Sequence, residues 1–219
     1  MENTKVETAL SSVKDFVFCN NSTESQDAYT RHSVNYDKEL DTLNYQSPQY
    51  AAKMFGKYCD GAKSVLDIGT GTGKAAELIR KKYGYEGDLD LLDANLGMLV
   101  QADKKGFNIR NVIRHWVDEK GELPLKDESY DIVLCVGSFV PHHIPVTALW
   151  GMIKSVKRGG LFIVTTRSTS TESYKMDFDR TLQKVIDAKE LELVEKEDYK
   201  NFPNAQDELL NVVIVLRRV

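Results

Sequence analysis

A short apolar segment that runs directly into a glycine-rich loop constrains this chain more than any other feature. The segment reads VLDIGTGTGK over residues 65–74. Its apolar residues predict a buried strand at 64–68, and the apolar spacing after the loop predicts a helix at 74–83. Glycines at such a turn allow the backbone to lie close to a ligand. A strand, a glycine loop and a helix in this order predict an open α/β sheet with a ligand site at the loop.

Strands and helices continue to alternate along the 219-residue chain. Further apolar strands are predicted at residues 89–92, 111–117, 131–136, 161–165, 191–194 and 212–216. Helices are predicted from Asn95, from Pro145 to a turn at Gly159–Gly160, and over 174–188. Only a loop separates the last two strands, so we expect them to form an antiparallel hairpin. The predicted fold class is α/β: a doubly wound seven-stranded sheet, mostly parallel with an antiparallel C-terminal hairpin strand, and helices on both faces.

The N-terminal quarter of the chain precedes this alternation. Residues 1–30 are polar with weak apolar periodicity, and they predict a tail or a loosely docked first helix. Residues 31–60 predict a short helix, a break at Ser47-Pro48, and a second helix opened by that proline. We expect these helices to form a lid on a single domain that covers residues 31–219.

The composition is that of a globular protein, with 42% hydrophobic and 28% charged residues. A net charge of −4 without a basic block disfavours nucleic-acid binding, because proteins that contact phosphates usually present a basic face. No apolar run approaches the roughly 20 residues of a membrane span, and no signal peptide is evident. Three cysteines without a C-x-x-C pair are typical of a reducing compartment. We expect a cytoplasmic monomer with a small-molecule substrate and no nucleic-acid or membrane partner.

Two kinds of cofactor suit a glycine loop after a first strand. Gly71, Gly73 and Ala76 satisfy the dinucleotide pattern G-x-G-x-x-G/A, with Asp93 at about the expected downstream distance. Asp67, however, lies at the strand tip before the loop, where a carboxylate repels a pyrophosphate and suits an ammonium and a sulfonium group. The pattern G-x-x-x-x-G-K-[ST] does not match, because positions 68 and 75 are isoleucine and alanine. The loop therefore favours S-adenosylmethionine over NAD.

The predicted second strand also ends on a carboxylate. Asp93 can accept hydrogen bonds from both ribose hydroxyls of an adenosine, which is a charge-assisted contact. The alternative is that Asp93 only caps the helix that begins near Asn95. Met98, at the start of that helix, either lines the adenine or packs in the core. The predicted cofactor site includes Asp93, Ala94 and Met98.

Four motifs in order carry a resemblance to a known family. They are VLDIGTGTG (65–73), LLDANLGML (91–99), ELPLKDESYDIVLCVGSF (122–139) and VKRGGLFIVTTR (156–167). With these motifs the chain resembles the class I S-adenosylmethionine-dependent methyltransferases. The segment YDKELDTLNYQSPQYA (36–51) adds a closer resemblance to the animal methyltransferase-like proteins of the Williams–Beuren syndrome chromosomal region. The resemblance implies a methyltransferase whose cofactor is S-adenosylmethionine.

The resemblance also implies which residues would contact the cofactor. Gly69, Thr70 and Gly71 would pack against its methionine part, and Asp93 would hold its ribose. The residues after the predicted fourth strand would line the floor beneath the sulfonium. These are Val136, Gly137 and Ser138.

The adenine would lie beside the residues that follow the predicted third strand. Trp116 and Val117 would frame its ring, and Asp118 or Glu119 would reach its exocyclic amine. The sequence departs here from the family's usual Gly-Asp-Ala pattern, so the acid that contacts the adenine is open.

The acceptor would lie between the N-terminal helices and the segment after the fourth strand. Tyr36 and Tyr45 would either close over the methionine carboxylate or pack in the helix interface with their hydroxyls at the surface. His142 and His143 are candidate general bases, because histidine titrates near neutral pH. The alternative is a pair of loop histidines without a catalytic role. The pair lacks further ligands for a metal ion, so no metal site is predicted.

Three functions remain open. Enzymes of this class that methylate amide or exocyclic amino nitrogens carry Asn/Asp-Pro-Pro-Tyr after the fourth strand, and this chain has Gly-Ser-Phe-Val at 137–140. A methyltransferase acting on a small molecule or, as the less favoured acceptor, a protein side chain is therefore the leading hypothesis. A cofactor-binding scaffold without catalysis and a nicotinamide-dependent oxidoreductase are the alternatives.

Overall fold

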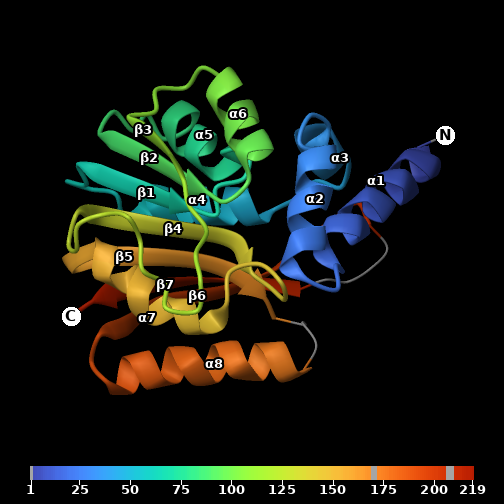
Figure 1. Ribbon diagram of the computed structural model, residues 1–219. Coiled ribbons are helices and arrows are strands. Elements are labelled where there is room, and N and C mark those ends of the chain that lie inside the picture. The colour runs from blue at the N-terminus through green and yellow to red at the C-terminus, as the bar shows by residue number, and fades with distance from the viewer. Residues whose placement is uncertain (1, 169–171, 206–209) are drawn as a thin grey trace.

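Seven strands in the described part of the chain form one sheet. The computed structural model describes residues 2–168, 172–205 and 210–219 (Figure 1). The strands are β1 (Ser64–Ile68), β2 (Asp88–Asp93), β3 (Asn111–Arg114), β4 (Tyr130–Phe139), β5 (Val156–Arg167), β6 (Leu191–Lys200) and β7 (Leu210–Arg218). Their spatial order is β3-β2-β1-β4-β5-β7-β6. β1 to β5 are parallel, and β7 lies antiparallel between β5 and β6. The predicted fold class, with its C-terminal hairpin, is confirmed.

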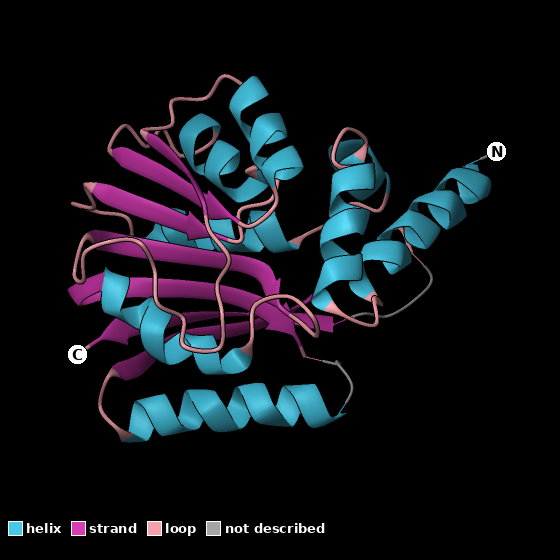
Figure 2. Ribbon diagram, viewed as in Figure 1, coloured by secondary structure: helices cyan, strands magenta, loops and turns pink. Residues whose placement is uncertain are grey.

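Helices cover both faces of the sheet (Figure 2). One face carries α4 (Ser47–Tyr58), α5 (Lys74–Lys81) and α6 (Leu96–Lys104), and the other carries α7 (Leu149–Met152) and α8 (Glu172–Asp187). Side chains alternate along β1, so Val65 packs on the side of α4 and α5, and Leu66 and Ile68 on the side of α7 and α8. All of β1 is buried. Burial on both faces explains why its sequence is apolar almost throughout.

Three further helices form a cap beyond the ends of the parallel strands. They are α1 (Glu2–Val17), α2 (Ser22–His32) and α3 (Tyr36–Thr42), the blue elements of Figure 1. Their small core contains Val13, Phe16 and Leu40, which pack with Phe202 from the segment after β6. Of the two expectations for residues 1–30, a tail or a loosely docked first helix, the structure has helices and not a tail. Apolar residues at helical spacing, Ala9, Val13 and Phe16, bury one face of α1 against the rest of the cap.

Polar contacts attach this helical cap to the sheet domain. Asp37 of α3 lies 2.6 Å from Lys105 and accepts a 2.5 Å hydrogen bond from the Thr72 hydroxyl. The Asn95 amide, before α6, donates to the Gln26 carbonyl oxygen at 2.9 Å. The cap is thereby joined to the glycine loop and to the start of α6.

The segment between β4 and β5 differs from its prediction. A helix was expected from Pro145 to a turn at Gly159–Gly160, but the structure has only the short α7 between the 3₁₀ turns Val146–Ala148 and Ile153–Ser155. β5 begins at Val156 and continues through both glycines, with a register shift against β4. Glycines can mark such a strand irregularity as well as a turn. None of the helices in the described ranges is long and apolar enough to cross a membrane.

Candidate cofactor and acceptor site

A cavity opens between the helical cap and the ends of the parallel strands. It lies beyond β1, β2 and β4, where ligands bind in doubly wound sheets. We call it the glycine-loop cavity. The predicted site residues that line it are Tyr36, Tyr45, Gly69, Gly71, Asp93, Ala94, Met98, Trp116, Val117, Val136, Gly137, Ser138 and His143. The lining residues that were not predicted are Gln26, Tyr29, Leu92, His115 and Ile144.

The backbone N–H groups of the glycine loop are largely occupied by protein acceptors. Gly69 and Thr70 both donate to the Leu92 carbonyl oxygen, at 2.8 and 3.1 Å. Gly71 donates to Oδ2 of Asp93 at 2.8 Å. Gly69 has a φ of +66°, and a Cβ there would lie 2.3 Å from Oγ of Ser138. The loop therefore needs glycine at position 69, and it offers few free amides to a phosphate.

Asp93 is the carboxylate at the tip of β2. Its Oδ2 accepts from Gly71, and its Oδ1 accepts from the backbone N–H of Asn95 at 2.8 Å. Burial raises the pKa of Asp93, and these backbone hydrogen bonds act in the opposite direction. Asn95 itself is the N-cap of α6, because its side chain accepts from the Met98 N–H. Asn95, and not Asp93, is therefore the N-cap of α6, so the need for a helix cap does not explain why position 93 is a carboxylate.

Asp67 does not line the cavity, in contrast to the prediction. It lies on the face of β1 that packs toward α4 and α5, and its Oδ2 accepts a 2.7 Å hydrogen bond from the Thr70 hydroxyl. Burial raises the pKa of Asp67 to about 7. Its Oδ1 is buried and has no hydrogen-bond partner among the described residues. Strand alternation turns Asp67 away from the cavity. Asp67 and Thr70 therefore do not line the cavity, and their hydrogen bond stabilises the glycine loop.

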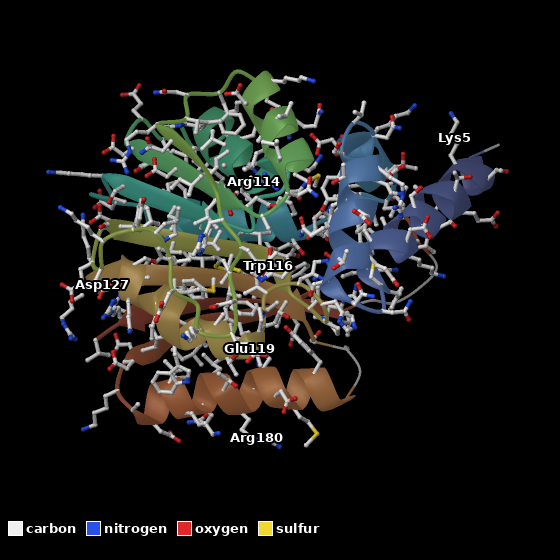
Figure 3. All side chains as sticks on the ribbon, viewed as in Figure 1. Lys5, Arg114, Trp116, Glu119, Asp127 and Arg180 are labelled. Atoms are coloured by element: carbon white, nitrogen blue, oxygen red, sulfur yellow. The ribbon has the colours of Figure 1, made fainter. Side chains whose placement is uncertain are left out.

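The segment after β3 brings Trp116 and Val117 to the cavity but turns Asp118 away. Figure 3 shows Trp116 and Glu119 on the long connection between β3 and β4, which crosses in front of the sheet. Asp118 is exposed, and its Oδ1 accepts the N–H groups of Lys120 and Gly121 at 2.9 and 3.2 Å. Its carboxylate therefore holds a turn, and the predicted contact of Asp118 with the cavity is wrong.

His115 lies in the cavity wall where an acid was expected. Its Nε2 lies 3.0 Å from the Glu122 carbonyl oxygen. Because a carbonyl oxygen only accepts, Nε2 carries the proton and Nδ1 of the neutral ring is an acceptor. The sequence offered one signal for this residue, its position directly before Trp116 at the end of the third strand.

His143 and Tyr29 form a hydrogen-bonded pair on the cap side of the cavity. Nδ1 of His143 lies 2.8 Å from the Pro141 carbonyl oxygen, so it carries the ring proton. Nε2 therefore accepts from the Tyr29 hydroxyl, at 2.8 Å. Burial lowers the pKa of His143 to about 4, and the nearby Arg167 acts in the same direction. The imidazole is neutral at physiological pH.

His142 is not part of this arrangement. It has a φ of +64° and is exposed, and it does not line the cavity. The left-handed backbone at this position directs the two consecutive imidazoles to different environments. The prediction of a catalytic His142 is therefore not supported by its position.

The hydroxyl of Tyr45 lies against the end of β4. A Cβ at Gly137 would be 2.4 Å from this hydroxyl oxygen, and Gly137 has a φ of +68°. Gly137 is therefore required both by the backbone and by the tyrosine. Tyr36 lines the same cavity and packs against Phe16, with ring centroids 5.3 Å apart. Both tyrosines therefore line the cavity, and their closure over the methionine carboxylate stays a prediction.

Comparison with known proteins agrees with this geometry. Residues 65–160 match a family model described as a methyltransferase domain. The match assigns residues 65–160 to a methyltransferase domain. Human methyltransferase-like protein 27 is 31% identical over 164 residues, a match covering 73% of this chain and 65% of the human protein. The resemblance predicted from the four motifs is confirmed.

Two bacterial proteins are more distantly similar to this chain. A demethylmenaquinone methyltransferase of Lactobacillus johnsonii is 34% identical over 114 residues, a match that covers 49% of this chain and 46% of that protein. The structure of a geranyl diphosphate C-methyltransferase from Streptomyces coelicolor, solved with S-adenosyl-L-homocysteine, superposes with a TM-score of 0.61 at 11% identity. The superposition covers 84% of this chain and 86% of the Streptomyces coelicolor chain. The chain thus spans about two thirds or less of the curated relatives named here, and the solved structure shows a shared fold.

Trp116 offers an optical test of the site in this methyltransferase domain. It lines the cavity and is 43% exposed, whereas Trp150 is similarly exposed at 37% but lies on α7, away from the cavity. We expect S-adenosylhomocysteine to change the tryptophan fluorescence of the protein, because a bound adenine would alter the environment of Trp116. The change should disappear in Trp116→Phe and persist in the matched control Trp150→Phe. A change that survives in Trp116→Phe contradicts the position assigned to the adenine.

Proposed function

We propose that this protein transfers a methyl group from S-adenosylmethionine to a small-molecule acceptor. The observation that carries the proposal is the position of Asp93, a carboxylate at the tip of β2 that lines the cavity and is not needed as the cap of α6. A carboxylate at this point suits the two hydroxyls of a ribose. The family of the domain supports the same assignment.

The remaining cavity residues suit the other parts of the cofactor. We assign the methionine part to the glycine loop at Gly69 and Gly71, which line the cavity and whose backbone can lie close to a ligand. We assign the adenine to Trp116, Val117 and the acceptor Nδ1 of His115. The other residues proposed to contact the cofactor are Tyr36, Tyr45, Ala94, Met98, Val136 and Gly137.

Among the described residues, Tyr29 and His143 are the pair that we expect to take up the proton that the acceptor loses on methylation. When bound, S-adenosylmethionine supplies a methyl group on a sulfonium, which is displaced in line by the acceptor atom. Positioning contributes much of the catalysis in such a reaction. An acceptor that carries a proton would pass it to the Tyr29 oxygen as the Tyr29 proton moves to Nε2 of His143. The neutral tautomer of His143 has a free electron pair at Nε2 for this step.

The position of the helical cap over the cavity favours a small-molecule acceptor over a polymer. The helical cap lies over the ends of the parallel strands (Figure 1) and is attached to the sheet domain through Asp37 and Asn95. The net charge of −4 gives little attraction for a phosphate backbone. We further propose that the protein works as a cytoplasmic monomer, a location with which its three free cysteines are compatible.

The two alternative functions have less support. A nicotinamide cofactor needs backbone N–H groups for its pyrophosphate, and those of Gly69, Thr70 and Gly71 donate to protein atoms. The role of a scaffold without catalysis would not explain why a hydrogen-bonded tyrosine and histidine, Tyr29 and His143, line the cavity.

Calorimetric titration tests the proposal directly. We expect the purified protein to bind S-adenosylhomocysteine at a single site and NADH not at all, because the glycine loop lacks free amides for a pyrophosphate. Binding of NADH without binding of S-adenosylhomocysteine would contradict the proposal and support the oxidoreductase. 5′-Methylthioadenosine, which lacks the amino-acid part of the cofactor, serves as the control for the adenosine contacts.

A further inference from the structure

A second cavity adjoins the first on the cap side. It shares Tyr29, Tyr36, Tyr45 and Gly137 with the glycine-loop cavity, so the two cavities are neighbours at these residues. We call it the Arg167 cavity, after the one charged side chain among the described residues of its wall. Arg167 is the last residue of β5. Its wall is otherwise mostly apolar or aromatic, including Val13, Phe16 and Val140.

Arg167 has no counter-charge in the described part of the chain. Its side chain forms no ion pair or hydrogen bond with another described residue, and its guanidinium carbon lies 5.5 Å from the centroid of the Phe18 ring. The titratable groups that face it are the hydroxyls of Tyr29 and Tyr45 and the imidazole of His143. None of these groups carries a negative charge at neutral pH. Burial lowers the pKa of Arg167.

Two other arginines of this protein, the exposed Arg110 and the buried Arg218, have protein partners, although Nε of Arg218 has none among the described residues. Arg110 pairs with Asp88 and Asp90 at 2.6 and 2.5 Å. The buried Arg218 donates to the carbonyl oxygens of Ile153 and Val156. A cation taken out of water without a partner lowers stability, so such a residue is usually kept for a ligand. A guanidinium presents a planar set of donors that matches the two oxygens of a carboxylate or the oxygens of a phosphate.

We propose that Arg167 binds an anionic group, a carboxylate or a phosphate, of the methyl acceptor. This inference rests on the proposed function and narrows its substrate to an acidic small molecule with an apolar or aromatic body. The body would lie among Tyr29, Tyr36 and Val140, beside the Tyr29–His143 pair. The methionine carboxylate of the cofactor is a second source of the same chemistry. The acceptor is favoured, because Arg167 lines only the Arg167 cavity and not the one that contains Asp93 and the glycine loop.

Matched acids and amides provide the test. Acetate, hexanoate and phenylacetate are each compared with the corresponding amide, and inorganic phosphate is added as a fourth anion. The melting temperature of the protein is measured with each probe, with and without saturating S-adenosylhomocysteine. The variants are Arg167→Met, Arg167→Lys and the control Arg158→Met, which removes an exposed arginine paired with Glu128 far from the cavity. Affinity for S-adenosylhomocysteine is measured in parallel by calorimetry.

We expect at least one anion to raise the melting temperature of the wild-type protein more than its amide does. The difference should vanish in Arg167→Met, persist in Arg158→Met and survive in part in Arg167→Lys. Without any ligand, Arg167→Met should melt at the same or a higher temperature, because it removes a half-buried cation that has no partner among the described residues.

Each contrary result has a distinct meaning. Equal effects of acids and amides, or a preference for acids that survives in Arg167→Met, would overturn the inference. A fall of about tenfold or more in affinity for S-adenosylhomocysteine in Arg167→Met would assign Arg167 to the cofactor instead. A lower melting temperature of ligand-free Arg167→Met together with no anion effect would make Arg167 a structural residue. Failure of the wild-type protein to bind S-adenosylhomocysteine would refute the proposed function, and the comparison without that ligand would still test Arg167.

Discussion

Asp93→Ala is expected to weaken binding of S-adenosylhomocysteine about ten- to a hundredfold, since hydrogen bonds to a charged group contribute roughly 1.5–3 kcal/mol. The substitution removes the proposed ribose contact. It also removes the acceptor of the Gly71 and Asn95 N–H groups, which shape the loop that would hold the methionine part. Calorimetry on the purified variant measures the effect.

Two further variants separate binding from folding. Asp88→Ala removes an exposed carboxylate at the start of the same strand, and it should leave the affinity unchanged. Asp93→Asn keeps one side-chain oxygen and the size of the residue, so it should fold and still bind more weakly than the wild-type protein. An affinity that is unchanged in Asp93→Ala would restrict Asp93 to supporting the loop.

His143→Ala is expected to reduce methyl transfer about a hundred- to ten-thousandfold, the usual contribution of a positioned acid–base group. Affinity for S-adenosylhomocysteine should not change, because the proposed cofactor contacts do not include His143. The measurement is transfer of a labelled methyl group from S-adenosylmethionine into a fractionated small-molecule extract. Tyr29→Phe should cause a similar loss, since it removes the hydroxyl that donates to Nε2.

His142→Ala is the matched control for this experiment. It removes the adjacent, exposed imidazole, which does not line the cavity, and it should leave turnover nearly unchanged. Equal losses in His142→Ala and His143→Ala would contradict the assignment of a base to the Tyr29–His143 pair. Full activity in His143→Ala would limit the pair to a structural role.

The depressed pKa of His143 also predicts how stability depends on pH. The folded protein holds this imidazole neutral down to a pKa of about 4, whereas an unfolded chain protonates it near the usual histidine pKa of 6.5. The unfolded state therefore binds more protons between these values, and stability is lost as the pH falls from 6.5 to 4. The loss from this group amounts to roughly 3 kcal/mol. Denaturant unfolding at several pH values should show a smaller loss over this range in His143→Ala.

The repeating pattern of the sheet domain could be predicted from the sequence, because local chemistry determines it. Apolar runs predicted the positions of the strands, although β4, β5 and β6 extend beyond the predicted ends. The glycine loop predicted the ligand end of the sheet. The sequence did not predict how the polar N-terminus packs. The apolar face of α1 is narrow, and it is buried only by contacts with α3 and Phe202, which lie elsewhere in the sequence.

For the site, the sequence determined which residue types follow each strand, and tertiary structure decided which of them face the cavity. Gly69, Asp93 and Trp116 follow strands that end at one edge, so their approach to the cavity follows from chain order. Asp67 and Asp118 have the expected chemistry but are turned away by strand alternation and by a local turn. Long-range contacts alone bring Tyr29 of α2 to His143 after β4 and leave the Arg167 side chain without a hydrogen-bond or ion-pair partner among the described residues. No local pattern encodes such pairings, because they depend on how the helical cap packs over the sheet.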